Sequence, residues 1–519
     1  MLDLIIRNGR IVTATEILPA GLEIGVRDGT IAVIGLDLDA GPNTEIVDAE
    51  GAYITPGGVD SHAHIEQDNS PTGDTWTTGS RSAIAGGNTT VLAFASQRRD
   101  ETRLGPCVER YHAKATGNSY CDYGFHVIVT NATDEILDED LPHLARADGG
   151  GITSVKLYMT YAPLHLGDGD LFRIMLAARS LGVTTMIHAE NHDMVEQIMH
   201  RLAARGHTQT QFHAVARPQI AETEATYRAI SLAAVTDAPI LLVHMSAPAA
   251  LEHVRAAQAR LLPIHAETCP HYLYLTSEKL HSHDRDGGLG GHDGIDGAQH
   301  ICAPPLRHDK RDLEQLWAEL ANGTYTVVSS DHAPALYDHP DGKKRGITAA
   351  GHVDFRVVPN GLPGIETRLP LLFDRTYDPE VGPPAAEDAP MHISLPRFVA
   401  LTSTNPAQLY GLAHKKGSLQ PGLDADIVVW YPATSPPFTI TNAALHHRID
   451  YTPFEGRAVR NWPRYVFLRG RRVWDRDHGG VLGQPGDGQY LPRTKSRILT
   501  GQPGRTATGM GYGERKAWM

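Results

Sequence analysis

The sequence predicts an α/β fold: a (β/α)8 TIM barrel with a small composite β-sandwich domain built from both chain ends. Three observations indicate this fold. Strand-like apolar runs alternate with helical stretches over residues 56–415, short β-rich segments stand at both ends, and 519 residues suffice for a barrel with an appendage. A doubly wound open sheet is the alternative, but no Gly-rich dinucleotide fingerprint follows the first run.

The two ends of the chain are expected to form one sandwich domain. In the first part, residues 1–55, two strand-like segments flank Arg27-Asp28-Gly29, a hairpin signal. The second part, residues 416–482, has the same character at 424–430 and 465–470. Because the two ends of a domain often lie close together, these parts should pair. Residues 483–519 show no periodicity and are expected to form an extended C-terminal tail, frayed or packed on a neighbouring subunit.

Eight apolar runs are the expected barrel strands. Most are apolar throughout, as strands buried on both faces should be. Helical stretches such as 171–181 and 224–234 separate them, and a loop rich in Gly, Asp and His is expected at 281–300. The runs are 58–64, 90–95, 125–130, 154–159, 184–190, 240–246, 262–267 and 326–331.

Composition excludes several classes of protein. With 41% hydrophobic and 21% charged residues, the chain is globular rather than disordered. A net charge of −13 gives no basic field for nucleic acid or an anionic membrane, so neither is an expected partner. No apolar run reaches the ~18 residues of a membrane span. The four cysteines form no CxxC pair, which indicates a reducing, cytoplasmic location.

Metal-ligating side chains end several of the expected strands. His62 and His64 form an HxH motif, and residues two apart on a strand point to the same side. His188, His244 and Asp331 end three other runs. Because strand ends meet at the C-terminal face of a barrel, where active sites form, these side chains should converge. Imidazole and carboxylate are ligands for a divalent ion such as zinc, and satisfied core histidines are the alternative.

Lys156 lies inside the apolar run 154–159. Burial and a nearby metal would both oppose its charged form, so its pKa should fall. A neutral amine can react with CO2 to give a carbamate, an anion able to bridge two metals. The alternative is a lysine whose head reaches solvent along its apolar stem.

The order HxH, Lys, His, His, Asp on a barrel flanked by a split β-domain resembles the cyclic amidohydrolases of the amidohydrolase superfamily. Within them the chain is similar to the dihydropyrimidinase and hydantoinase group, over nearly its whole length. The motifs that carry this resemblance are residues 54–60, 86–90, 156–161, 188–191, 267–270, 304–307, 359–366, 422–428 and 450–456.

The resemblance implies two divalent metal ions, usually Zn²⁺, with Mn²⁺ or Co²⁺ as alternatives. The two histidines of the HxH motif and Asp331 would hold one ion, and His188 and His244 the other. Carbamylated Lys156 and a hydroxide would bridge them. The hydroxide would attack the carbonyl of a cyclic amide or ureide, such as a dihydropyrimidine or a 5-substituted hydantoin, and Asp331 would carry its proton to the leaving nitrogen. A homotetramer is also implied.

Three substrate contacts are implied by the same resemblance. Tyr161 stands where the family uses a phenol to hydrogen-bond the developing oxyanion. Asn360 matches the family's ring-binding position, which acts through backbone groups. Ala303 stands where the family often has Ser, and a contact through the backbone would serve equally well.

Two features near the HxH motif concern the substrate. Glu66 occupies the position where dihydroorotases place an Arg for a substrate carboxylate, which argues against that activity. Residues 65–70 are acidic and polar where hydantoinases usually have a more apolar loop. Allantoinase and cyclic imide hydrolase therefore stay open as alternatives on the same site. A non-catalytic scaffold is disfavoured because all six ligand positions are filled.

Overall fold

A computed structural model of the chain describes residues 1–281, 295–349, 351–383, 391–498 and 500–501. Eight parallel strands form its central sheet, in chain order from β7 to β14. A bridge between Ala63 and His332 joins the first strand to the chain that follows the last, so the sheet curls into a nearly closed barrel. The strands are β7 (Gly58–Ala63), β8 (Asn88–Ser96), β9 (Asp122–Ile128), β10 (Ser154–Tyr158), β11 (Thr184–His188), β12 (Ile240–Leu242), β13 (Ile264–Thr268) and β14 (Val327–Val328). The predicted (β/α)8 barrel is confirmed.

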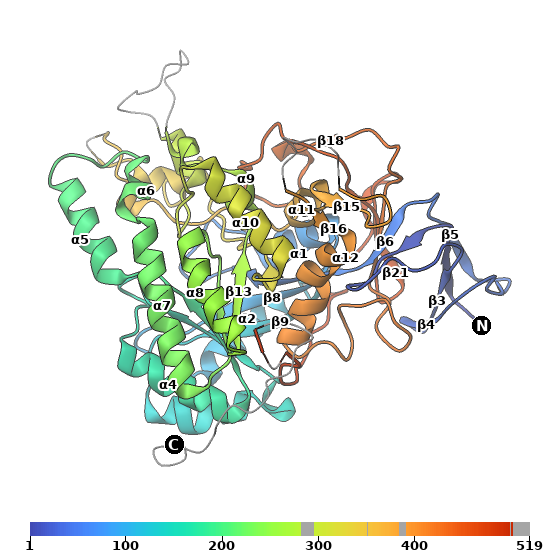
Figure 1. The fold of residues 1–519 in the computed structure, drawn as a ribbon, viewed down its shortest axis with the longest axis horizontal. Helices are drawn as coiled ribbons and strands as arrows, with labels where there is room; N and C mark the ends of the chain where they lie inside the picture. Colours follow the sequence, from blue (N-terminus) through green and yellow to red (C-terminus); the bar gives the residue numbers. More distant parts are fainter. Residues whose placement is uncertain (282–294, 350, 384–390, 499, 502–519) are drawn as a thin grey trace.

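Helices surround this sheet on the outside (Figure 1). Polar side chains start several of them: Thr75 forms a capping box on α1, and Asn191 accepts an amide of α5. No helix in the described part of the chain is long and apolar enough to cross a membrane. The longer helices are α1 (Trp76–Ala85), α2 (Gly105–Ala115), α4 (Asp168–Leu181), α5 (His192–Ala203), α7 (Gln219–Thr236), α8 (Pro248–Ala259) and α10 (Lys310–Asn322). The shorter ones are α3 (Leu141–Leu144), α6 (Phe212–Ala216), α9 (Pro270–Tyr274), α11 (Arg368–Asp374), α12 (Leu395–Val399) and α13 (Asn405–Leu409).

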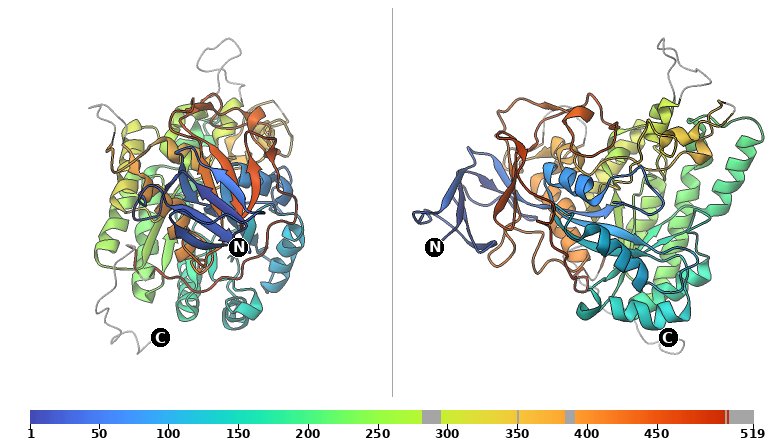
Figure 2. Two further views of the ribbon diagram at one scale, coloured as in Figure 1. Left: turned by 90° about the vertical axis from the view of Figure 1, so that its right-hand side faces the viewer. Right: turned by 180° about the vertical axis from the view of Figure 1, so that it is seen from behind.

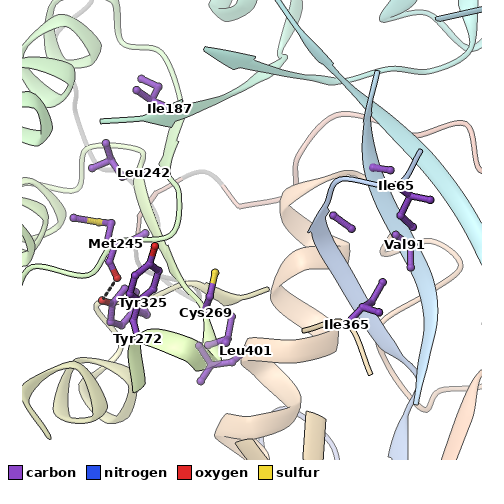
Figure 3. Packing of buried hydrophobic residues seen from close by; sticks show 14 of the residues in the cluster. Ile65, Val91, Ile187, Leu242, Met245, Cys269, Tyr272, Tyr325, Ile365 and Leu401 are labelled. Carbon is purple, nitrogen blue, oxygen red and sulfur yellow. Dashed lines mark hydrogen bonds between the residues drawn. The ribbon is translucent and has the colours of Figure 1, made fainter. Parts of the chain in front are cut away.

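The barrel's core is a continuous set of buried side chains from strands and helices (Figure 3). Ile187 and Leu242 come from the neighbouring strands β11 and β12. The hydroxyl of Tyr325 donates a hydrogen bond to the carbonyl of Met245 at 3.1 Å, so this polar atom within the core is paired.

Two smaller sheets form the sandwich at the side of the barrel, where the N-terminus lies (Figures 1 and 2). Strand β17, from late in the chain, pairs with the early strand β6, and apolar residues of both sheets share one core. At the predicted hairpin, Asp28 and Gly29 both have positive φ, as its turn requires. The composite sandwich is therefore confirmed, while its exact boundaries stay a prediction. One sheet holds β4 (Thr30–Gly35), β3 (Glu23–Arg27), β1 (Leu4–Arg7) and β5 (Glu45–Asp48) in that order. The other holds β2 (Arg10–Ile11), β6 (Tyr53–Pro56), β17 (Ile427–Trp430), β20 (Pro463–Leu468), β21 (Arg471–Asp475) and β22 (Gly480–Val481). Two further pairs are β15 (Thr376–Tyr377) with β16 (Ile393–Ser394) and β18 (Phe438–Thr439) with β19 (Ala458–Val459).

The described part of the C-terminal tail lies against the barrel of its own chain. The amide of Leu491 donates to the carbonyl of Tyr123 at 2.7 Å. The buried guanidinium of Arg493 donates to Ser154 Oγ at 2.7 Å. Both acceptors lie near the starts of their strands, so the tail packs at the end of the barrel away from the strands' carboxyl ends. The tail from residue 502, and most of the loop expected at 281–300, lie outside the described residues.

A buried lysine joins the barrel to the sandwich. Lys416 Nζ lies 2.7 Å from Asp122 of β9, 2.8 Å from Asp426 and 2.9 Å from Asp424, which precede β17. Burial opposes the charged form of Lys416, but the three carboxylates outweigh it and raise its pKa. The cluster therefore links elements from two parts of the chain through one cation.

Replacing this cation should weaken the whole structure. We expect Lys416→Met to lower the free energy of unfolding by about 3–5 kcal/mol, because it leaves buried carboxylates uncompensated. Calorimetry would show this as a lower Tm. Lys415→Met is the matched control, since that side chain is 42% exposed and 4.0 Å from Asp424. Equal Tm values for the two variants would contradict the expectation.

Candidate metal and active site

A cavity of about 430 Å³ opens at the carboxyl ends of the barrel strands. Two of the nine predicted site residues, His62 and Lys156, are not among those that line it and are fully buried. The other seven predicted residues line the cavity: His64, Tyr161, His188, His244, Ala303, Asp331 and Asn360. The structure thus brings the separate strand ends of the sequence to one place.

One cluster of potential ligands gathers around Asp331. Its Oδ1 lies 3.1 Å from His62 Nε2 and 3.6 Å from His64 Nε2. Ligand atoms of His62, His244 and Asp331 all lie within 4.8 Å of one another. Burial opposes the charged form of Asp331, but His62 and His64 outweigh it, so the pKa of Asp331 lies well below its usual range. Asp331 is therefore a carboxylate at neutral pH.

A second pair of imidazoles faces the same cavity. The ring centres of His188 and His244 are 4.4 Å apart. His188 Nε2 lies 2.7 Å from Glu190 Oε2, which leaves Nδ1 as the free ligand atom. His244 Nδ1 is buried, and nothing in the described part of the chain bonds to it. Burial is the main cause that lowers the pKa of both rings, so both are neutral and able to bind a metal.

Lys156 lies between these two groups and is 0% exposed, which excludes the arrangement in which its head reaches solvent. Its Nζ lies 3.4 Å from His62 Nε2 and 5.2 Å from the centre of the Phe94 ring. Lys156 forms no ion pair with any residue that the structure describes. Burial lowers its pKa to about 8, against the opposing effect of Glu267 and Asp331. A substantial fraction of this amine is therefore neutral near physiological pH.

Glu267 supports both ligand groups, although no sequence pattern assigned it a role. Its Oε1 lies 2.6 Å from His62 Nδ1 and accepts the backbone N–H of His244 at 3.2 Å. Its Oε2 accepts the hydroxyl of Ser329 at 2.8 Å. A carboxylate at Nδ1 fixes the tautomer of His62 and leaves Nε2 free to bind. The available sequence signal was a lone acid inside the apolar strand β13.

Backbone conformation also sets the direction of two ligands. His244 has φ 40° and Asp331 has φ 46°, in the left-handed region that residues with side chains rarely adopt. Behind Asp331, the ring of His332 lies 3.0 Å from Asp74 Oδ2 and accepts the amide of Gly364. Strained residues of this kind concentrate at functional sites, where surrounding contacts hold them.

Tyr161 lies at the wall of the cavity and is held by a buried ion pair. The Arg217 guanidinium lies 5.1 Å from the centre of the Tyr161 ring, and its Nη1 lies 2.6 Å from Glu190. Glu190 in turn contacts His188, so one chain of contacts connects this ligand to the phenol. Burial raises the pKa of Tyr161, so the phenol keeps its proton and can donate a hydrogen bond. Arg217 lies before α7 and far from any site motif, so no sequence pattern pointed to it.

Ala303 and Asn360 also line the cavity, on two separate backbone segments. The amide of Gly361 donates to the carbonyl of Ile301 at 3.0 Å, which joins these two segments. Gly361 has φ 121°, and a Cβ there would lie 2.1 Å from the carbonyl oxygen of Ala333. Only glycine fits at this point, because the wall packs directly on the loop after β14.

The loop after the HxH motif contributes polar groups to the cavity. Gln67, Asn69 and Ser70 line it, whereas Glu66 is not among the lining residues. Glu66 Oε2 instead accepts the amide of Trp76 at 2.9 Å, at the start of α1. The acid that argued against a dihydroorotase therefore caps a helix.

The donor set fits a divalent ion. Neutral imidazoles and a carboxylate are ligands for metals such as zinc, and the orphaned His244 Nδ1 is a buried polar atom that a metal would satisfy.

Comparisons with known proteins agree with this arrangement. Residues 53–473 match the model of the amidohydrolase family. A D-hydantoinase of Ralstonia pickettii is 38% identical over 499 residues, which cover 95% of this chain and 99% of that protein. Among solved structures, a D-hydantoinase (dihydropyrimidinase) from Thermus sp. has a TM-score of 0.83 at 33% identity, and covers 95% of this chain and 100% of that chain. An L-hydantoinase (dihydropyrimidinase) from Arthrobacter aurescens has a TM-score of 0.79 at 26% identity over the same shares.

Proposed function

Because the chain belongs to the amidohydrolase family, and is a metal-dependent hydrolase of cyclic amides like its hydantoinase and dihydropyrimidinase relatives, we propose that its substrate is a 5-substituted hydantoin or a dihydropyrimidine. The ring opens when water adds its oxygen to a ring carbonyl carbon and the adjacent C–N bond breaks. The products are a carboxylate and a free ureide nitrogen. The observation that carries this proposal is that four of the six ligand positions line one cavity, while the other two, His62 and Lys156, lie buried beside them.

We propose that two divalent ions, Zn²⁺ or in its place Mn²⁺ or Co²⁺, bind at these positions. His62, His64 and Asp331 would hold one, and His188 and His244 would hold the other. When bound, such ions polarise a carbonyl and make water a stronger acid. Lys156, once its Nζ has added to CO2 and lost a proton, would supply an anionic ligand for both ions. The buried, partly neutral amine supports this modification.

Three of the chain's own groups act on the substrate in this proposal. Asp331, an acceptor at neutral pH, takes a proton from the attacking water and delivers it to the leaving nitrogen. Tyr161 donates a hydrogen bond to the carbonyl oxygen as negative charge develops there. The backbone at Asn360 and Ala303 orients the ring, since its paired N–H and C=O edge matches peptide groups.

We further propose that the D-enantiomer of a hydantoin is preferred. The relatives at 37–38% identity are D-hydantoinases, whereas the L-hydantoinase neighbour shares 26%.

A substrate panel tests this function directly. Purified protein loaded with zinc, manganese or cobalt should open 5-substituted D-hydantoins and dihydrouracil, measured as release of the ring-opened carboxylate. Allantoin and succinimide should be poorer substrates than these. Activity confined to allantoin or succinimide would favour the alternatives, and no ring opening with any metal would refute the proposal.

The carbamate is tested by removing its amine. Lys156→Ala should lose activity and metal because no anion then separates the two dications. Short carboxylic acids should restore part of both, since a carboxylate can replace the carbamate, whereas chloride at equal concentration should not. Metal content by elemental analysis and ring opening are the two readouts. Wild-type activity of this variant without any additive would refute the bridging role.

Tyr161 is tested by a change of one atom. Tyr161→Phe keeps the ring against Arg217 but removes the donor, so turnover should fall by roughly 10²–10³. Metal content should stay at the wild-type value, because the phenol is not a proposed ligand. A loss below about tenfold would remove Tyr161 from the mechanism.

A further inference from the structure

Lys343 is a second buried lysine near the cavity, and the reaction described above does not use it. It begins the 3-10 helix η5 (Lys343–Gly346), after the last barrel strand, and is 0% exposed. Its Nζ donates hydrogen bonds to the carbonyls of Ile301 at 3.1 Å, Pro359 at 2.7 Å and Gly361 at 2.8 Å. An ammonium has three donors, so each donor has one backbone carbonyl.

These carbonyls belong to the wall of the cavity. Pro359 and Gly361 flank Asn360, and Ile301 lies two residues before Ala303. The carbonyl of Ile301 also accepts the amide of Gly361 at 3.0 Å. Pro359 and Gly361 line the cavity themselves, whereas Lys343 does not, so Lys343 joins the two backbone segments without facing the cavity.

The same contact sets the direction of an amide. In a trans peptide the carbonyl and the following N–H point in opposite directions, and the only cis peptide bond in the described residues is Ala303–Pro304. Because the carbonyl of Pro359 points to Lys343, the N–H of Asn360 points away from it. None of the described residues accepts this N–H. It is therefore a free donor on the segment that lines the cavity.

We propose that Lys343 is a positioning residue for the substrate ring: its ammonium holds the Ile301 and Pro359–Gly361 segments at the separation and orientation that ring binding needs. The inference rests on the proposed function, in which Asn360 and Ala303 contact the ring. Donors that are held in place before binding lose less freedom when the ligand arrives, which strengthens binding.

The hydrogen bonds of Lys343 form despite the desolvation penalty of burying its amine. No carboxylate in the described residues pairs with it, and the groups near it are Cys302, His213 and His300. Burial lowers the pKa of Lys343, and Cys302 opposes that effect. The three backbone carbonyls, each of which accepts one N–H, favour its ammonium form. An apolar side chain of similar volume would avoid this desolvation penalty but would leave the carbonyls of Pro359 and Gly361 without this donor.

The test compares Lys343→Met with Lys344→Met. The control residue is adjacent, has a side chain 37% exposed, and pairs at the surface with Asp338. In Lys343→Met we expect KM for the ring substrate to rise about tenfold or more, as a bound ring loses an oriented partner. Metal content should equal that of the control, and kcat should change by less than about threefold, because the metal ligands and Tyr161 are untouched.

Hydrogen exchange gives a readout that does not depend on activity. The Gly361 amide, which bonds to Ile301, should exchange about tenfold faster in Lys343→Met than in Lys344→Met. If the wild-type protein opens no ring, the proposed function fails. This measurement still tests whether Lys343 holds the two backbone segments together.

Unchanged KM together with unchanged exchange at Gly361 would overturn the inference, as would a fall in kcat alone. Should Lys343→Met fail to fold, Lys343→Arg replaces it, since a planar guanidinium cannot reach all three carbonyls in the same geometry. A raised KM with faster exchange in that variant supports the inference, and wild-type values for both refute it.

Discussion

The buried amine of Lys156 is the constraint on which the catalytic face depends. Strand β10 carries it into the barrel, where its Nζ lies 3.4 Å from a histidine nitrogen and it forms no ion pair within the described part of the chain. Such a group cannot stay a bare cation beside further positive charge without a large penalty. Conversion to an anion would reverse the sign of that interaction. The carbamate would then attract the two dications that the histidines on either side are proposed to bind.

The carboxylates around the ligands have two different roles. Asp331 faces the cavity and is kept ionised by the imidazoles beside it. Glu267 and Glu190 lie behind the histidines and fix which ring nitrogen is free. Lys343 provides the same kind of support for backbone rather than for side chains. The reacting groups are thus few, and most of the buried charge nearby orients them.

Much of this arrangement could be predicted from the order of residues. Buried strands carry near-continuous apolar runs, so all eight barrel strands were found within a few residues of their observed bounds, and ligands placed at strand ends had to meet. The supporting residues could not be found in this way. Arg217 and Lys343 lie in connecting segments, whose course cannot be predicted from hydrophobic periodicity. Their partners are also distant in sequence. Glu66 shows the converse: its charge was visible, but its contact with the Trp76 amide depends on a local turn.

The pairing of β17 with β6 has a consequence for biosynthesis. Strand β6 precedes the whole barrel, yet its antiparallel partner β17 leaves the ribosome more than 370 residues later. The N-terminal strands must therefore wait, unpaired along this edge, while the barrel is translated. This order of strands therefore requires that the exposed edge be protected during synthesis, by a chaperone or by the nascent barrel itself.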